Sequence, residues 1–298
     1  MSLSVLVSGS SGRTGKKIVS ALSNSGARVI SFIRDPSKEK EMIKLGSSSV
    51  VIGNMLDRQT INKALFNIDI ILHIGPPMHP DEKVITKNFI DEAKKRRVAK
   101  FIYYSVMHPL RRSVRHHSLK LDCEEMLIES GIPYSIIQPI RYMQHLNLNF
   151  LAHTDSSSVL SMPFDIEKKF NIVDLSDVAE ASAHIALEDS WLYGTFELAG
   201  PEALSQIDMC EIISEIIDEK ELNYPNGVIA KRLRIDELRL KSQKAGIPDD
   251  KINQMINMNN HYDKYGFLGN SKVLEMVLGR KPNTFKEYFC KLLDSIEE

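Results

Sequence analysis

The chain has 298 residues, of which 43% are hydrophobic, and its 38 Lys and Arg residues nearly balance its 39 Asp and Glu residues. This composition is typical of a globular protein, and the net charge of −1 gives no overall attraction to nucleic acid or to an anionic membrane. No apolar stretch reaches the length of a membrane span, and the chain opens on an expected strand rather than on a signal peptide. We therefore expect a cytoplasmic protein that binds neither nucleic acid nor membrane.

The three cysteines, Cys123, Cys210 and Cys290, lie far apart and have no ligand-like spacing. An odd number of widely separated cysteines is typical of buried thiols in a reducing compartment. The sequence thus predicts no disulfide and no metal site.

The first half of the chain alternates between short apolar runs and segments with helical periodicity. The expected strands are 3–8, 28–33, 48–52, 68–74, 100–106 and 133–138. One helical segment runs from Asp81 to Arg97, with Ile85, Phe89 and Ala93 on one face. Near-continuous apolar strands separated by helices predict an α/β fold with a doubly wound parallel sheet, whose ligands bind at the carboxyl ends of the strands.

The regular alternation stops near residue 150. Residues 159–173 suggest an irregular or hairpin excursion, Asp177 is the expected cap of a helix through Leu187, and 194–200 suggests one further strand. Helical patterns dominate from Ser205 onward. We expect a dinucleotide-binding core at 1–155, to which 170–200 returns, and a smaller, mostly helical lobe made of 156–169 and 201–298.

A glycine-rich turn, Gly9-Ser-Ser-Gly-Arg-Thr-Gly15, directly follows the first expected strand and precedes an amphipathic segment. Glycines permit a sharp turn and close approach of a pyrophosphate, and the N-terminus of the next helix favours the same anion. A glycine pattern alone also fits an ordinary turn, but the strand–turn–helix order favours a dinucleotide site. The expected cofactor contacts of this loop are Gly9, Ser11, Gly12, Arg13, Thr14 and Gly15.

The residue after the second strand bears on which dinucleotide binds. Arg34 stands there, followed by Asp35. A guanidinium suits a 2′-phosphate, and Arg13 could reach the same group, so the sequence favours NADP(H). The alternative is that Arg34 is an ordinary surface residue and Asp35 binds the ribose of NAD.

The ends of the other strands complete the expected cofactor groove. Each assignment depends only on position after a strand. The residues are Asn54 and Met55 after the third strand, Gly75 and Pro76 after the fourth, Ser105 at the end of the fifth, and Pro139 and Tyr142 after the sixth.

Several motifs together resemble the NmrA-like family, atypical members of the extended short-chain dehydrogenase/reductase superfamily. They are the loop at 9–15, Arg34, Lys120-x-x-x-Glu124, Ser130 to Pro139, Asp174 to Ala179, Phe196 to Glu202 and Leu278 to Phe285. The resemblance implies a Rossmann domain that binds NADP(H), with a C-terminal lobe closing a cleft over the nicotinamide. Some members of the family reduce quinones, aldehydes and related substrates with NADPH, whereas others are silent NADP(H) sensors that regulate a partner.

The superfamily's usual catalytic pair is Tyr-x-x-x-Lys, and here Lys120 follows His116 rather than a tyrosine. The resemblance implies that Lys120 contacts the cofactor. If the helix begins early enough, His116 shares a face with Lys120 and could donate a proton. If Ser118 is the N-cap, His116 lies in a solvated basic loop instead.

Three more residues bear on this site. Tyr104 and Ser105 end a strand where the superfamily often keeps a hydroxyl that orients substrate, and Ser105 is the third catalytic candidate beside Lys120 and His116. Glu124 could pair with Lys120 one turn away, and His73 fits a hydrogen-bonded core residue better than a catalyst.

An apolar wall could line the substrate pocket or merely join the two parts of the chain. Its residues are Met107, Tyr142, Met143, Phe150, Met162, Phe164, Met255 and Met258. The first hypothesis for function is an NADPH-dependent oxidoreductase of an apolar carbonyl, quinone or activated alkene, acting as a monomer or homodimer. The second is a non-catalytic NADP(H) sensor that regulates a protein partner, and the third is a redox-neutral isomerase or cyclase.

Overall fold

The structure is a computed structural model that describes residues 2–146, 158–221 and 227–297. It contains two compact units, of which the first comprises Met1–Pro139, Leu175–Leu198 and Met276–Gly279, and the second Ile140–Asp174, Ala199–Glu275 and Arg280–Glu298. The first unit thus ends at Pro139 rather than at 155, and its returning segment begins at Leu175 rather than at 170. The reason is that the chain after Pro139 bonds to the segment before Leu175, with Val173 N donating to Arg141 O and Met143 N donating to Val173 O.

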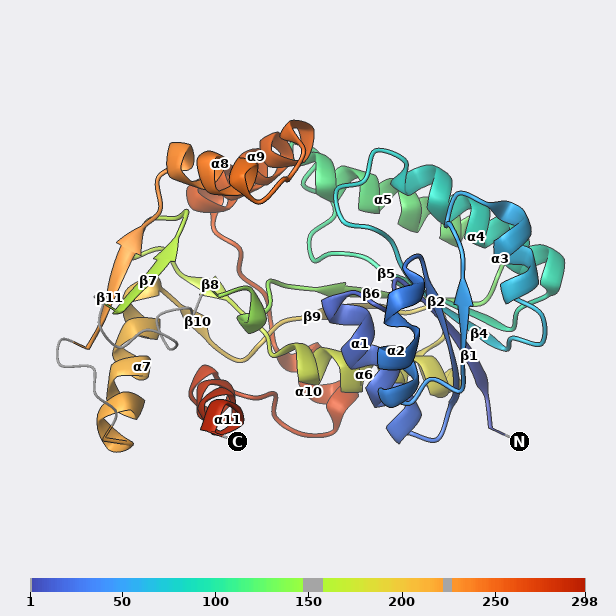
Figure 1. The fold of residues 1–298 in the computed structure, drawn as a ribbon, viewed down its shortest axis with the longest axis horizontal. Coiled ribbons are helices and arrows are strands. Elements are labelled where there is room, and N and C mark those ends of the chain that lie inside the picture. The colour runs from blue at the N-terminus through green and yellow to red at the C-terminus, as the bar shows by residue number, and fades with distance from the viewer. Residues whose placement is uncertain (1, 147–157, 222–226, 298) are drawn as a thin grey trace. The chain divides into compact units, whose positions relative to one another are not determined.

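The first unit is built on a seven-stranded parallel sheet in the order β3-β2-β1-β4-β5-β6-β9 (Figure 1). The strands are β1 (Ser4–Ser8), β2 (Arg28–Ile33), β3 (Ser49–Ile52), β4 (Ile70–Ile74), β5 (Lys100–Tyr104), β6 (Tyr134–Pro139) and β9 (Thr195–Leu198). This order confirms the expected doubly wound α/β fold. The strand order reverses between β1 and β4, and such a switch point opens a crevice at the carboxyl ends of the strands.

Helices cover both faces of this sheet. They are α1 (Arg13–Asn24), α2 (Glu39–Lys44), α3 (Arg58–Ala64), α4 (Glu82–Arg96), α5 (Arg115–Ile128) and α6 (Leu175–Leu187). In Figure 1, α3, α4 and α5 lie side by side over one face, while α1 and α6 pack together on the other. All five residues of β1 are buried, which explains the uninterrupted apolar run in its sequence.

The core beneath α3, α4 and α5 is built from the strand residues that point to this face of the sheet. Leu6, Phe32, Ile71 and Phe101 project from four strands into one buried cluster that also holds Phe89 of α4. The Phe32 and Phe89 rings meet edge to face, with centroids 5.8 Å apart and ring planes at 79°. This packing fixes α4, whose N-terminus lies beside the end of β4.

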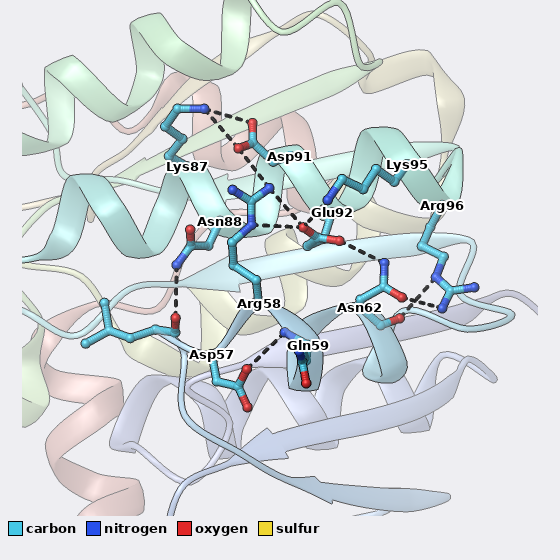
Figure 2. A network of polar contacts seen from close by, with 11 residues as sticks. Asp57, Arg58, Gln59, Asn62, Lys87, Asn88, Asp91, Glu92, Lys95 and Arg96 are labelled. Atoms are coloured by element: carbon cyan, nitrogen blue, oxygen red, sulfur yellow. Dashed lines mark hydrogen bonds and ion pairs between the residues drawn. The ribbon is translucent and has the colours of Figure 1, made fainter.

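A polar network joins α3 to α4 on the outer side of this layer (Figure 2). The Glu92 carboxylate accepts hydrogen bonds from Arg58 Nε at 3.0 Å, Asn62 Nδ2 at 2.8 Å and Lys95 Nζ at 2.7 Å. The Glu92 side chain is only 3% exposed, so these donors compensate for its loss of hydration.

The second unit contains two small sheets and several helices. β7 (Ser158–Met162) pairs in parallel with β11 (Val228–Arg232), and β8 (Phe170–Asn171) pairs antiparallel with β10 (Ala203–Leu204). The helices are α7 (Gln206–Glu219), α8 (Ile235–Lys244), α9 (Asp249–Tyr265) and α11 (Phe285–Glu297), while α10 (Lys272–Leu278) has residues in both units.

Of the two alternatives expected for 159–173, an irregular or a hairpin excursion, the hairpin does not form, because β7 pairs with β11 and β8 with β10. The Gln206 side chain donates to both Leu160 O and Lys231 O and so bridges β7 to β11. One local expectation is wrong. Asp177 is not a cap, since α6 already begins at Leu175 and Asp177 lies buried in its first turn.

All three cysteines are free thiols, but Cys290 is only half-buried, unlike Cys123 and Cys210. Within the described ranges, no helix has the length and apolar character needed to cross a bilayer. In that same part of the chain, no three His, Cys, Asp or Glu residues gather as they would around a metal ion.

Candidate active site

The turn after β1 has a shape that only glycine permits at two positions. Gly9 has φ +64°, and a Cβ there would lie 2.7 Å from Ile74 O at the end of β4. A Cβ on Gly15 would lie 2.5 Å from Ser10 Cα. The loop therefore folds tightly on itself and against β4, at the sheet's switch point.

Helix α1 begins directly from this loop, with Gly12 as its N-cap. In any α-helix the first-turn amides point out of the N-terminal end, which in α1 faces the glycine loop. The first turn of α1 carries no acidic residue. The helix dipole and these amides make the loop a place for an anion.

Arg34 lies exposed directly after β2. In the part of the chain that the structure describes, its guanidinium makes no ion pair with a carboxylate. Asp35 is the N-cap of the following turn, where its Oδ1 accepts from Ser37 N at 2.9 Å. Hydrogen bonds from Ser37 lower the pKa of Asp35. The carboxylate of Asp35 is thus hydrogen-bonded within the turn, while the guanidinium of Arg34 is exposed to solvent.

The residues after β3 lie as follows. Asn54 is exposed, and its Oδ1 accepts from Leu56 N at 3.0 Å, which stabilises the turn. Met55 is half-buried and packs against the hydrophobic core. Asn54 is therefore on the surface of the expected groove, whereas much of Met55 serves packing.

The end of β4 brings the glycine loop next to Lys120. A Cβ on the buried Gly75 would lie 3.3 Å from Glu82 Oε1 and 3.8 Å from Lys120 Nζ. Lys120 Nζ donates to Tyr104 O at 2.9 Å and lies 2.7 Å from Glu82 Oε1. Ile74 and Gly75 thus lie between the glycine loop and Lys120, while Pro76 follows, half-buried.

Glu82 was missed by sequence reasoning. It opens α4, where an acidic residue normally faces solvent beside the positive end of the helix dipole. The sequence signal that could have pointed to Glu82 as a site residue is its position seven residues after Gly75. In the structure it is fully buried.

Helix α5 begins at Arg115 with Val114 as its N-cap, so His116 lies inside the helix, one turn before Lys120. The alternative in which Ser118 is the N-cap is wrong: its hydroxyl donates to Arg115 O at 3.0 Å from within the helix. His116 is half-buried, and its ring lies edge-on to that of His117, with centroids 6.0 Å apart.

The expected pair of Glu124 with Lys120 does not form. Glu124 accepts hydrogen bonds from Ser105 Oγ and, at 2.8 Å, from Gln138 Nε2. Burial raises the pKa of Glu124, and these two donors and the charge of Lys120 oppose the rise. Ser105 is thus the hydroxyl that joins the end of β5 to α5.

A pocket of about 480 Å³ opens beside this network, within the first unit. Its wall combines apolar side chains with a few charged groups and consists of His108, Pro109, Leu110, Arg111, Leu121, Glu124, Gln138 and Glu197. His108 Nε2 lies 3.7 Å from Glu197 Oε1. Burial lowers the pKa of His108, as does Arg111, while Glu197 opposes the change.

His73 lies fully buried at the centre of the sheet, as a core residue should. Its Nδ1 is 2.8 Å from Ser8 Oγ and its Nε2 is 3.3 Å from Thr86 Oγ1. The expectation that it is a hydrogen-bonded core residue is confirmed.

Pro139 ends β6, where its carbonyl accepts from Met107 N at 3.0 Å. Tyr142 belongs to the second unit, where its backbone pairs with Val173. Of the expected apolar wall, Met107 is buried in the first unit, and Met143, Met162 and Phe164 are buried in the second. Phe150 lies outside the described residues.

The family model of the NmrA-like family matches residues 1–289. The chain belongs to this family. Among curated proteins, quinone oxidoreductase 2 of Escherichia coli is 21% identical over 97% of this chain and 99% of its own length. Prestalk A differentiation protein A of Dictyostelium discoideum is 22% identical over 85% of this chain and 78% of its own length.

Solved structures share the fold. The Escherichia coli quinone oxidoreductase complexed with NADPH has a TM-score of 0.78 at 20% identity, covering 97% of this chain and 99% of that one. The Citrobacter sp. triphenylmethane reductase complexed with NADP(H) has a TM-score of 0.80 at 18% identity, with the same coverage.

Proposed function

We propose that this NmrA-like protein binds NADP(H) at the switch point and is an NADPH-dependent oxidoreductase of an apolar carbonyl, quinone or activated alkene. The observation that carries the proposal is that the end of β4 lies against both the glycine loop and the Lys120–Glu82 pair. Three glycines, Gly9, Gly15 and Gly75, allow this close packing, because a Cβ on each would meet neighbouring protein atoms. The two structural neighbours solved with NADPH or NADP(H) support the choice of cofactor.

Each part of the site has a proposed role toward the dinucleotide. The loop amides from Ser11 to Gly15 hold the pyrophosphate, and Arg34 with Arg13 binds the 2′-phosphate. Asn54, Met55, Gly75, Pro76, Pro139 and Tyr142 are the further proposed cofactor contacts. When bound, the nicotinamide supplies the hydride.

The remaining residues orient the substrate and provide the proton. Lys120 holds a fixed position through Tyr104 O and Glu82. His116, one helical turn away, is the proposed proton donor in place of the superfamily's tyrosine. The pocket beside Ser105 has the volume typical of small-molecule sites and a largely apolar wall, which suits a small ring compound.

The first test is cofactor choice. Arg34→Ala should weaken NADPH binding about tenfold or more and leave NADH binding within about twofold, because only NADPH carries the 2′-phosphate. Fluorescence titration of both dinucleotides measures this. Equal losses for the two would refute the assignment of Arg34.

The second test is turnover. Oxidation of NADPH, followed by its absorbance, should occur with a member of a quinone and carbonyl panel and fall at least about a hundredfold in Lys120→Ala and His116→Ala. The absence of a tyrosine before Lys120 favours a second candidate, an NADP(H) sensor that regulates a protein partner. Tight NADPH binding without turnover of any substrate would support the sensor instead.

A further inference from the structure

Glu82 and Lys120 form a buried ion pair between α4 and α5. Their side chains are 0% and 5% exposed, and Glu82 Oε1 lies 2.7 Å from Nζ. Across the residues that the structure describes, neither carboxylate oxygen has a partner in hydrogen-bond geometry. The carboxylate is therefore held mainly by the charge of the lysine, whereas the lysine also donates to Tyr104 O at 2.9 Å.

The pair lies directly under the loop that follows β4. The space in which a Gly75 Cβ would stand is 3.3 Å from Oε1 and 3.8 Å from Nζ, and the preceding Ile74 contacts the glycine loop. Burial lowers the pKa of His73 and the charge of Lys120 lowers it further, so this charge also acts on its surroundings. A dinucleotide bound as proposed above would lie in the field of this pair.

The two forms of a nicotinamide dinucleotide differ in charge, because the oxidised ring is cationic and the reduced ring is neutral. A lone buried ammonium close by would disfavour the oxidised form, and a lone carboxylate would favour it. We propose that Glu82 sets the preference of this site between the two oxidation states, because its carboxylate neutralises Lys120. The inference rests on the proposed binding of NADP(H) at this site.

The test compares dissociation constants for NADP⁺ and NADPH, and their ratio cancels any contact that both forms share. Glu82→Gln should raise the ratio of Kd for NADP⁺ to Kd for NADPH on the order of tenfold. Lys120→Met should lower the ratio, and the double variant should return it close to that of the wild type. General damage to the site would weaken both forms together and leave the ratio unchanged.

A second ion pair joins the same two helices and gives a matched control. Lys83 Nζ lies 2.9 Å from Asp122 Oδ2, but these side chains are 49% and 30% exposed. Asp122→Asn removes the same charge in solvent and should change the ratio less than twofold. An unchanged ratio in Glu82→Gln, or shifts of the same sign in both single variants, would overturn the inference. If the wild type binds neither dinucleotide, the proposed function fails instead.

Discussion

His73 should make the stability of this protein depend on pH. Its ring is fully buried between Phe89, with ring centroids 4.5 Å apart, and Phe101, at 6.0 Å. Burial, and after it the charge of Lys120, lower the pKa of His73 from 6.5 to about 3. The imidazole is therefore neutral in the folded protein throughout the neutral and mildly acidic range.

The sign and the size of the effect follow from linkage. Between about pH 3 and pH 6.5 the unfolded chain binds a proton at His73 that the folded chain does not, so stability falls as the pH falls. One pKa unit corresponds to about 1.4 kcal/mol, so His73 alone removes about 2 kcal/mol of unfolding free energy between pH 7 and pH 5.

Urea unfolding of the wild type and of His73→Asn at pH 7 and pH 5 measures this change in unfolding free energy. Asparagine cannot titrate but can still hydrogen-bond Ser8. Between pH 7 and pH 5 the unfolding free energy of His73→Asn should therefore fall by about 2 kcal/mol less than that of the wild type. Parallel stability curves for the wild type and His73→Asn would show that the imidazole does not titrate as this geometry requires.

Three other substitutions test the glycine loop and two contacts that hold the helices of the first unit in place. Gly15→Ala places a Cβ 2.5 Å from the Ser10 backbone and should weaken NADPH binding at least about tenfold by titration, because the loop must open. Lys100→Met leaves the carbonyls of α6 without the donor that now reaches Ile185 O at 2.8 Å, and should lower the free energy of unfolding in urea by about 1–3 kcal/mol. Glu92→Gln should cost about 1.5–3 kcal/mol in the same assay without changing NADPH affinity, since its charge-assisted bonds only join α3 to α4.

The first unit was predictable because its signals are local. A buried parallel strand is a short apolar run, and a helix between strands has its own period, so β2 occupies 28–33 as expected. The second unit was less predictable because its strands pair across long stretches of chain. β11 carries Lys231 and Arg232 and pairs with β7, which lies 70 residues earlier, and no periodicity within either strand indicates that partner.

The glycine loop was predictable because its strand–turn–helix order can be read from the sequence. Lys120 was singled out through the family resemblance and not through spacing alone. Side-chain partners were not predictable, because they depend on which groups of other elements reach the same buried point. Glu124 stands one turn from Lys120, yet Ser105 and Gln138 take its oxygen.

The end of β5 holds both Lys120 and Glu124. Lys120 is tied to the carbonyl of Tyr104, and Glu124 to the hydroxyl of Ser105, so two adjacent residues at the end of β5 fix two successive turns of α5. Lys120 belongs to the proposed cofactor side, whereas Glu124 lines the 480 Å³ pocket. The same strand end therefore anchors the lysine of the proposed cofactor site and the carboxylate of the pocket wall.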